Sequence, residues 1–253
     1  MQTYRNLASE KIVQTLDQLA ARINERFPNS GLYFVCKELS AMAEQTSTRA
    51  DMIARPNIPL LLLIILLIAL AAATVVLLAG RALALEASME LTNVMQGVDA
   101  GVSLLIVLGG AAFYLSSLEG RWRRAAVLKD LHGFRSIAHV IDMHQLTKDP
   151  SALGGPRTSS SPERDMTRYE LVRYLSYCSE MLSLASKAAA IYAEKIPDPA
   201  VIDAVGDIER LSTDLSQKIW QKITLVETDV EEFRSATAVS AGELALSGQT
   251  SEG

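Results

Sequence analysis

The sequence predicts an all-α protein: a two-span transmembrane helical hairpin with cytosolic helical hairpins at its N-terminal and C-terminal sides. Three observations predict this fold class. Residues 58–79 carry no charge and a single hydroxyl group, that of Thr74. Residues 98–118 form a second apolar stretch, in which Asp99 is the one charged residue. Elsewhere apolar residues recur at helical spacing, and almost no segment alternates as a strand does.

Each apolar stretch is long enough to cross a bilayer, because a helix of about 20 residues covers roughly 30 Å. The loop between the spans, residues 81–96, contains one basic residue, Arg81. Basic residues concentrate on the outer flanks of both spans, at Arg49, Arg55, Arg121, Arg123, Arg124 and Lys129. Positive flanks stay in the cytoplasm. We therefore expect an integral multi-pass protein of a prokaryotic cytoplasmic (inner) membrane, with both termini cytoplasmic and membrane lipid as one partner.

The segment before the first span, residues 1–56, is expected to form an N-terminal cytosolic hairpin. Its first helix covers residues 3–27, where apolar residues recur at helical spacing at Ile12, Leu16, Leu19, Ile23 and Phe27. Residues 28–31 break this helix, and a second amphipathic helix runs to Met52. Two helices joined by so short a turn can bury both apolar stripes against each other.

Three segments follow the second span. The end of the second span is expected to be a lipid-interface anchor, in which one aromatic residue lies among cations. The anchor consists of Arg121, Trp122, Arg123 and Arg124. A separate juxtamembrane amphipathic helix is expected over residues 119–147. A flexible linker rich in Gly, Pro and Ser is expected over residues 148–161.

Residues 162–235 are expected to form a long cytosolic helical hairpin that resembles a coiled coil. Ser161 and Pro162 predict the start of its first helix, and Asp198 predicts a cap for its second helix, which runs to about Arg234. Its first helix carries apolar residues that are separated by steps of four and three residues, a spacing typical of a coiled-coil interaction seam. We call them the seam residues: Leu171, Leu175, Cys178, Leu182, Ala185, Ala189 and Tyr192. Residues 236–253 are expected to be disordered.

The net charge of −5 comes from the C-terminal third of the chain. Residues 162–253 hold sixteen acidic and nine basic side chains, whereas the rest of the chain is nearly balanced. Because an acidic domain repels a phosphate backbone, we expect no nucleic-acid partner. The sequence predicts no cofactor.

A polar set on residues 119–147 is the main candidate for chemistry. His132, Arg135, His139 and Asp142 fall on one face of a helix. Imidazole and carboxylate groups one turn apart can bind a metal or shuttle a proton. The alternatives are a solvated face, or a network of Arg135, His139 and Asp142 that joins this helix to a neighbour.

The second span carries small residues and one acid. Gly97, Gly101, Gly109 and Gly110 are expected to allow close helix packing, either against the first span or, less favoured, against another protomer. Asp99 could line the mouth of an oligomeric pore, or could cap the helix at the membrane interface.

These features favour a non-enzymatic membrane protein that acts as an adaptor or assembly subunit. Its cytosolic helices would bind a protein partner or form a homo-oligomer. No phosphate-binding glycine loop and no protease, esterase or kinase motif is present in the sequence. The alternatives are an oligomeric channel or membrane-permeabilising effector whose pore is lined by the second span, and a metal-dependent membrane enzyme that uses His132, His139 and Asp142.

Overall fold

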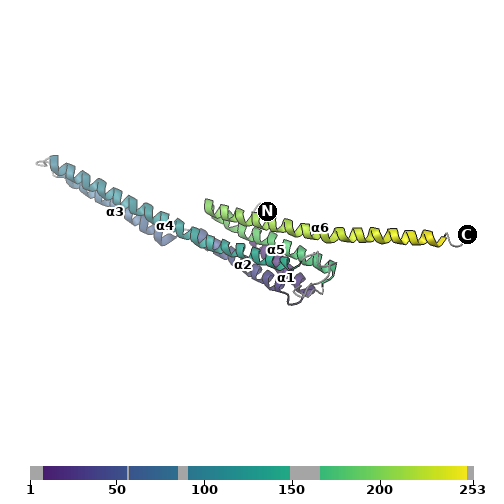
Figure 1. The fold of residues 1–253 in the computed structure, drawn as a ribbon. Helices are drawn as coiled ribbons and strands as arrows, with labels where there is room; N and C mark the ends of the chain where they lie inside the picture. Colours follow the sequence, from purple (N-terminus) through teal and green to yellow (C-terminus); the bar gives the residue numbers. More distant parts are fainter. Residues whose placement is uncertain (1–7, 56, 85–90, 149–165, 250–253) are drawn as a thin grey trace, which may run out of the picture. The chain divides into compact units, whose positions relative to one another are not determined.

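The computed structural model describes residues 8–55, 57–84, 91–148 and 166–249, and these residues form six α-helices without any strand (Figure 1). The all-helical fold class is therefore confirmed. The helices are α1 (Ser9–Arg26), α2 (Gly31–Ala54), α3 (Ile58–Ala84), α4 (Leu91–Leu146), α5 (Arg168–Lys195) and α6 (Pro199–Gln249). Two compact units divide the chain. We call Asp51–Val127 the apolar unit, and Met1–Ala50 together with Leu128–Gly253 the helical domain.

The apolar unit contains the two stretches that are long and apolar enough to cross a membrane. Along α3 the side chain of Ala71 is buried, with 4% of its surface exposed, whereas most of the large side chains around it are exposed. On the first part of α4, large side chains such as Ile106 and Phe113 are also exposed. So extensive an apolar surface has no stabilising partner in water, but it suits a lipid environment.

Two side chains of α4 tie it to the start of α3. The backbone N–H of Asn57 donates a hydrogen bond to Glu119 Oε1 at 3.1 Å. Arg123 forms an ion pair with Glu119 and donates to the carbonyl oxygen of Arg55 at 2.6 Å. The Glu119 carboxylate thus satisfies an N–H group at the positive end of α3, where negative charge is favourable.

The separate juxtamembrane helix predicted after residue 118 does not exist, because α4 is one continuous helix of 56 residues. The sequence offers only Gly120 as a breaker there. One glycine costs a helix only about 1 kcal/mol relative to alanine. By contrast, the predicted interruption between the N-terminal helices and the first apolar stretch is present, since α2 ends at Ala54 and α3 begins at Ile58.

In the helical domain, the predicted apolar stripe of α1 is buried at Ile12, Leu16, Leu19 and Ile23, and Phe27 is half-buried. The turn to α2 passes through Asn29, whose φ of 53° lies in the left-handed region that asparagine tolerates. The Asn29 N–H donates to Asn24 Oδ1 at 3.2 Å. Residues 3–7 of the predicted helix lie outside the described residues.

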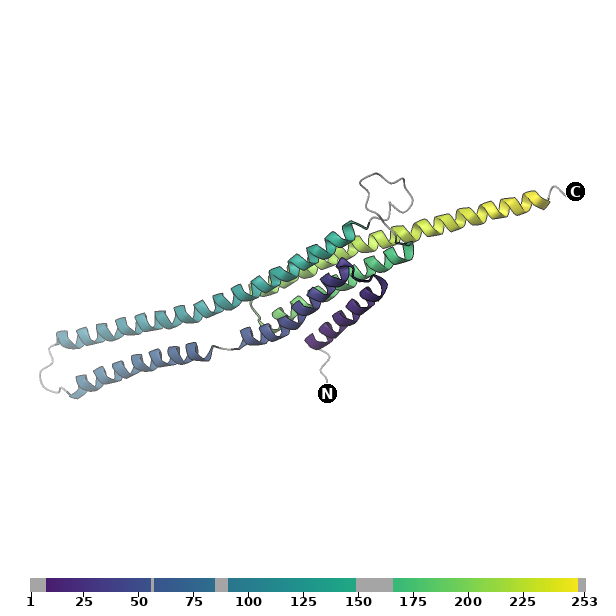
Figure 2. The same ribbon diagram turned by 90° about the horizontal axis from the view of Figure 1, so that it is seen from below.

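All seven seam residues are buried, as their spacing predicts. They are only part of the buried surface of α5, however. Tyr174, Tyr177, Met181, Ala188 and Ile191 are buried as well, so α5 is covered on most of its circumference. It packs against α6 and also against α1 (Figure 2). Helix α5 is therefore a central helix of the domain rather than one arm of an isolated hairpin.

The contacts of α5 with α1 join the two flanks of the chain into one domain. The Phe27 ring lies edge-on to Tyr174 at a centroid distance of 5.4 Å, and Arg22 forms an ion pair with Glu180 at 3.0 Å. The two flanks that the sequence predicts as separate hairpins are therefore parts of a single helical domain. The residues predicted as a flexible linker lie, from 149 on, outside the described residues.

Local capping sets the ends of the last two helices. Helix α5 begins at Arg168, because Thr167 and Glu170 form a reciprocal capping box. The start predicted at Ser161 and Pro162 lies outside the described residues. The predicted cap of α6 is confirmed, since Asp198 Oδ1 accepts from the Ala200 N–H at 2.9 Å.

Helix α6 continues to Gln249, past the end predicted near Arg234 and into the segment predicted as disordered. No proline interrupts residues 236–249, and alanine is the commonest residue there, which favours a helix. Residues 250–253 lie outside the described residues.

Candidate functional site

The histidines of the predicted metal site lie on the exposed surface of α4. On α4 the side chains of His132, Arg135 and His139 are exposed, and Asp142 is half-buried. Asp142 Oδ1 accepts a hydrogen bond from Gln145 Nε2 at 2.6 Å, and Gln145 Oε1 accepts from Lys222 Nζ of α6 at 2.7 Å. Over the described ranges, no three His, Cys, Asp or Glu side chains are close enough to hold a metal ion. The metal interpretation stays a prediction.

The four glycines of the second apolar stretch have open surroundings within the part of the chain that the structure describes. A Cβ atom placed on Gly97, Gly101, Gly109 or Gly110 would meet no side chain and no backbone of another helix within 4 Å there. The favoured interpretation, close packing within the chain, is therefore not supported at these positions, and packing between protomers stays a prediction. Asp99 is exposed.

The lipid-interface anchor is only partly available. Trp122 has 69% of its surface exposed, and Arg121 and Arg124 are exposed. The half-buried Arg123 is engaged with Glu119 and Arg55. One of the three arginines of this anchor therefore holds α3 and α4 together.

A three-helix junction forms around Asp130, and sequence reasoning missed it. Arg49 of α2 donates from Nε to Asp130 Oδ2 at 2.9 Å, and the Tyr192 hydroxyl of α5 donates to the same oxygen at 2.7 Å. Burial raises the pKa of Tyr192, and the hydrogen bond to the Asp130 carboxylate raises it further, so the phenol stays a donor. Only the burial of Tyr192 was predictable, through the seam pattern.

A small pocket adjoins this Asp130 junction. Its volume is about 180 Å³. It is lined by Met42, Gln45, Thr46, Arg49, Lys129, Asp130, Gly133, Phe134 and Tyr192. The pocket therefore combines two cations, one carboxylate and several neutral donors in one place.

A second junction surrounds His144, at the end of α4. Its ring lies so close to the first residue of α2 that a Cβ atom on Gly31 would come within 2.6 Å of His144 Cε1. His144 Nδ1 lies 3.4 Å from the Tyr174 hydroxyl, and the Lys148 ammonium lies over the Tyr174 ring. Burial lowers the pKa of His144, and the positive charge of Lys148 lowers it further.

This geometry predicts that acid destabilises the helical domain through His144. Because its pKa is lower in the folded state, the unfolded chain binds the proton first as the pH falls below about 6.5. The free energy of unfolding should therefore decrease with falling pH below that value, and replacing His144 with Gln should reduce the decrease. Thermal unfolding of the detergent-solubilised protein between pH 5 and 8 measures this. An identical pH profile for H144Q and the wild type would contradict the assignment.

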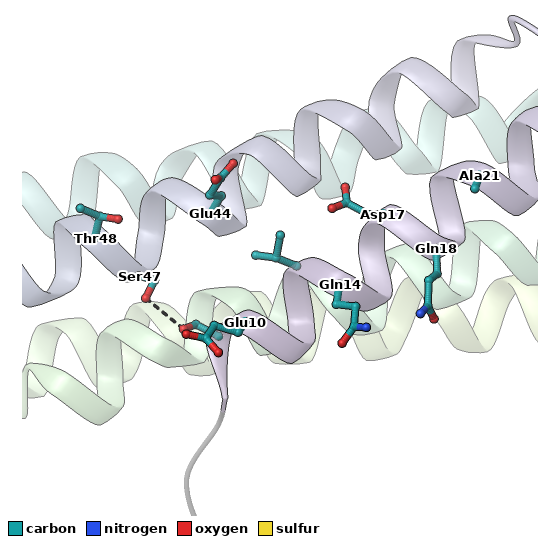
Figure 3. Close-up of a pocket in the computed structure, with 10 residues that line it drawn as sticks. Glu10, Gln14, Asp17, Gln18, Ala21, Glu44, Ser47 and Thr48 are labelled. Atoms are coloured by element: carbon teal, nitrogen blue, oxygen red, sulfur yellow. Dashed lines mark hydrogen bonds between the residues drawn. The ribbon is translucent and has the colours of Figure 1, made fainter.

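A groove lies between α1 and α2, near the N-terminal end of the chain (Figure 3). Its volume is about 680 Å³, with Val13 and Ala21 among its lining residues. Three acids, Glu10, Asp17 and Glu44, line it together with Ser9, Gln14, Gln18, Ser47 and Thr48. Ser9 Oγ and Ser47 Oγ lie 2.9 Å apart and join the helices at one end of the groove. Among the described residues that line the groove there are three acids and no cation, so the groove carries negative charge.

Neither cysteine is placed for chemistry. Both thiols are fully buried, and burial raises the pKa of Cys36 and of Cys178 to about 12. Because the thiolate is the reactive form, these side chains act as small apolar core residues.

Comparison with known proteins finds no relative: no protein-family model, no curated protein and no solved structure matches this chain.

Proposed function

We propose that this protein is an integral membrane adaptor or assembly subunit that crosses the bilayer twice and presents its helical domain to the cytoplasm. The spans are α3 and the first part of α4, and both termini lie on the cytoplasmic side. The domain serves to bind a protein partner or a second copy of the chain.

One observation carries the topology. Residues before the first span and residues after the second span share a core, through Phe27 with Tyr174 and through Asp130 with Arg49 and Tyr192. Segments that pack together in one core must lie in the same compartment. The intervening chain then crosses the bilayer an even number of times, which matches its two apolar stretches. The basic residues near the spans support the cytoplasm as that compartment.

The topology predicts which engineered thiols react from outside. The native cysteines are buried and serve as a silent background. A thiol at exposed Gln96, between the spans, should react with a membrane-impermeant maleimide on intact spheroplasts. A thiol at exposed Glu194 of α5 should react only after the membrane is permeabilised. Labelling of E194C on intact spheroplasts would overturn the proposal, as would recovery of the chain in the soluble fraction.

The α1–α2 groove is the partner surface that supports the adaptor role best. Its size lies within the usual range of ligand sites, and its acids would attract a partner segment that carries Lys or Arg. The seam residues cannot serve this purpose directly, because they are buried within the chain.

Charge reversal tests this surface. The double variant E10K/E44K should lose the copurifying protein or the second copy, since it converts attraction into repulsion. Its thermal stability should stay near that of the wild type, because both acids are exposed. The control E194K/E209K makes the same change of net charge on exposed acids of α5 and α6. Equal partner recovery from both double variants, measured by affinity purification, would argue against the groove.

The second candidate function is an oligomeric channel or membrane-permeabilising effector. The open surroundings of Gly97, Gly109 and Gly110 favour it, because small residues on a free helix face permit close contact between protomers. A detergent-solubilised complex of several copies, with liposome conductance altered in D99N, would support this function, whereas a strict monomer would exclude it.

A further inference from the structure

The pocket beside Asp130 has a charge pattern that the adaptor role does not explain. It lies where α2, α4 and α5 meet, and its volume of about 180 Å³ is below the roughly 300 Å³ at which sites for drug-sized ligands begin. It can therefore hold a small group, or the end of a larger molecule, but not a whole cofactor.

The carboxylate in the pocket is already satisfied. Asp130 Oδ2 accepts from both Arg49 and Tyr192, so its charge is balanced by an ion pair and a hydrogen bond. Arginine has five N–H donors, and the contact with Asp130 uses only Nε. Further donors of Arg49 thus remain for a second acceptor.

Lys129 supplies a second cation on the same pocket. Its side chain is exposed, and it makes no ion pair within the part of the chain that the structure describes. With Arg49 and Lys129 against Asp130, the lining carries a net charge of +1. Gln45, which is exposed, adds a neutral amide donor.

We propose that this pocket binds a phosphate group, which Lys129 and Arg49 hold through charge-assisted hydrogen bonds. Arginine and lysine are the usual phosphate ligands of proteins, the first through its planar fork and the second as a point charge. A small anionic group fits both the volume and the net charge of the pocket.

Two sources of phosphate share this chemistry: a phospholipid headgroup and free inorganic phosphate. The lipid as source rests on the proposed membrane topology. Lys129 lies seven residues after Trp122 on the continuous helix α4, a rise of about 10 Å. Side chains of a helix tilt toward its N-terminus, which for α4 is the side of the span. Lys129 is therefore the cation of the pocket that follows the second apolar stretch most closely along the chain.

Binding is tested on the full chain in a neutral maltoside detergent, with two probes. Inorganic phosphate is titrated while the thermal unfolding temperature is followed. Dioleoylphosphatidylglycerol is compared with diolein, which lacks the phosphate, by native mass spectrometry. Loss of one charge-assisted contact should weaken binding of the phosphate-bearing probe about tenfold in K129Q. K129R should restore it.

A matched control separates a site from general charge attraction. R135Q removes one exposed cation from the same helix, outside the pocket, and should leave binding unchanged. Binding of either probe with this pattern of variants supports the proposal. Retention of the lipid alone identifies the headgroup as the source, and binding of inorganic phosphate identifies the free anion.

The proposal is overturned if the wild type binds neither probe, or if K129Q and R135Q weaken binding equally. These outcomes are independent of the topology, because the phosphate titration takes place in detergent. Thiol labelling can contradict the membrane topology while phosphate still binds to the pocket. Likewise, the pocket can fail to bind phosphate while thiol labelling supports the topology.

Discussion

Replacing Leu175 and Leu182 together with Asp should prevent the helical domain from folding. Both side chains have 0% of their surface exposed, at the centre of α5. A carboxylate placed there without a partner costs several kcal/mol, and it also removes apolar contacts on every side. Two such costs are comparable with the whole stability of a typical domain, about 5–15 kcal/mol. Circular dichroism and limited proteolysis of the detergent-solubilised protein should show the cooperative unfolding transition lost.

The same substitution at Leu225 provides the control, because that side chain is 61% exposed on α6. L225D should unfold as the wild type does. A cooperative transition retained in L175D/L182D would mean that the seam residues are not the core of this domain. Because this double variant should not fold, failure of L175D/L182D to bind a partner would report the unfolding of the domain rather than damage to a binding interface.

Replacing Asp130 with Ala should have the second largest effect, a loss of about 2 to 3 kcal/mol. The carboxylate accepts from Tyr192, and such a hydrogen bond to a charged group contributes about 1.5 to 3 kcal/mol. The ion pair with Arg49 adds less, because nearly half of the Arg49 side chain is exposed and solvent screens it. Chemical denaturation of the solubilised protein measures the change.

Asp207 gives the matched control for this experiment. Its ion pair with Arg210 is exposed on α6, so D207A should change the free energy of unfolding by less than about 0.5 kcal/mol. Y192F combined with D130A tests whether the two residues act together, since the double variant should lose less than the sum of the single losses. Equal stability of D130A and D207A would show that the Asp130 junction contributes little.

The sequence alone was sufficient for features that depend on neighbouring residues. Two long apolar stretches predicted the apolar helices, and periodicity predicted the buried stripe of α1 and the seam residues of α5. The cap at Asp198 was predictable because its partner, Ala200, is two residues away. The capping box of Thr167 and Glu170 could also have been predicted from the sequence, because it is a hydroxyl residue followed three residues later by an acid.

Helix boundaries were harder to predict where the sequence changes its character but contains no residue that breaks a helix. The amphipathic character of residues 119–147 differs from that of the preceding span, which suggested two helices. The backbone of α4 nevertheless continues, because a change in the polarity of side chains does not interrupt the hydrogen bonds of a helix.

Only the tertiary structure decided which segments share a core and which polar groups meet. Arg22 and Glu180 are 158 positions apart, and Asp130 and Tyr192 are 62 apart. Helical periodicity identifies the face that a helix buries, but it does not identify the helix that covers it, since any complementary apolar stripe removes a similar area from water. For that reason the residues before and after the spans were expected to form separate hairpins, whereas packing around α5 unites them in one domain. The phosphate-sized pocket exists only because that packing brings Arg49, Lys129 and Asp130 together.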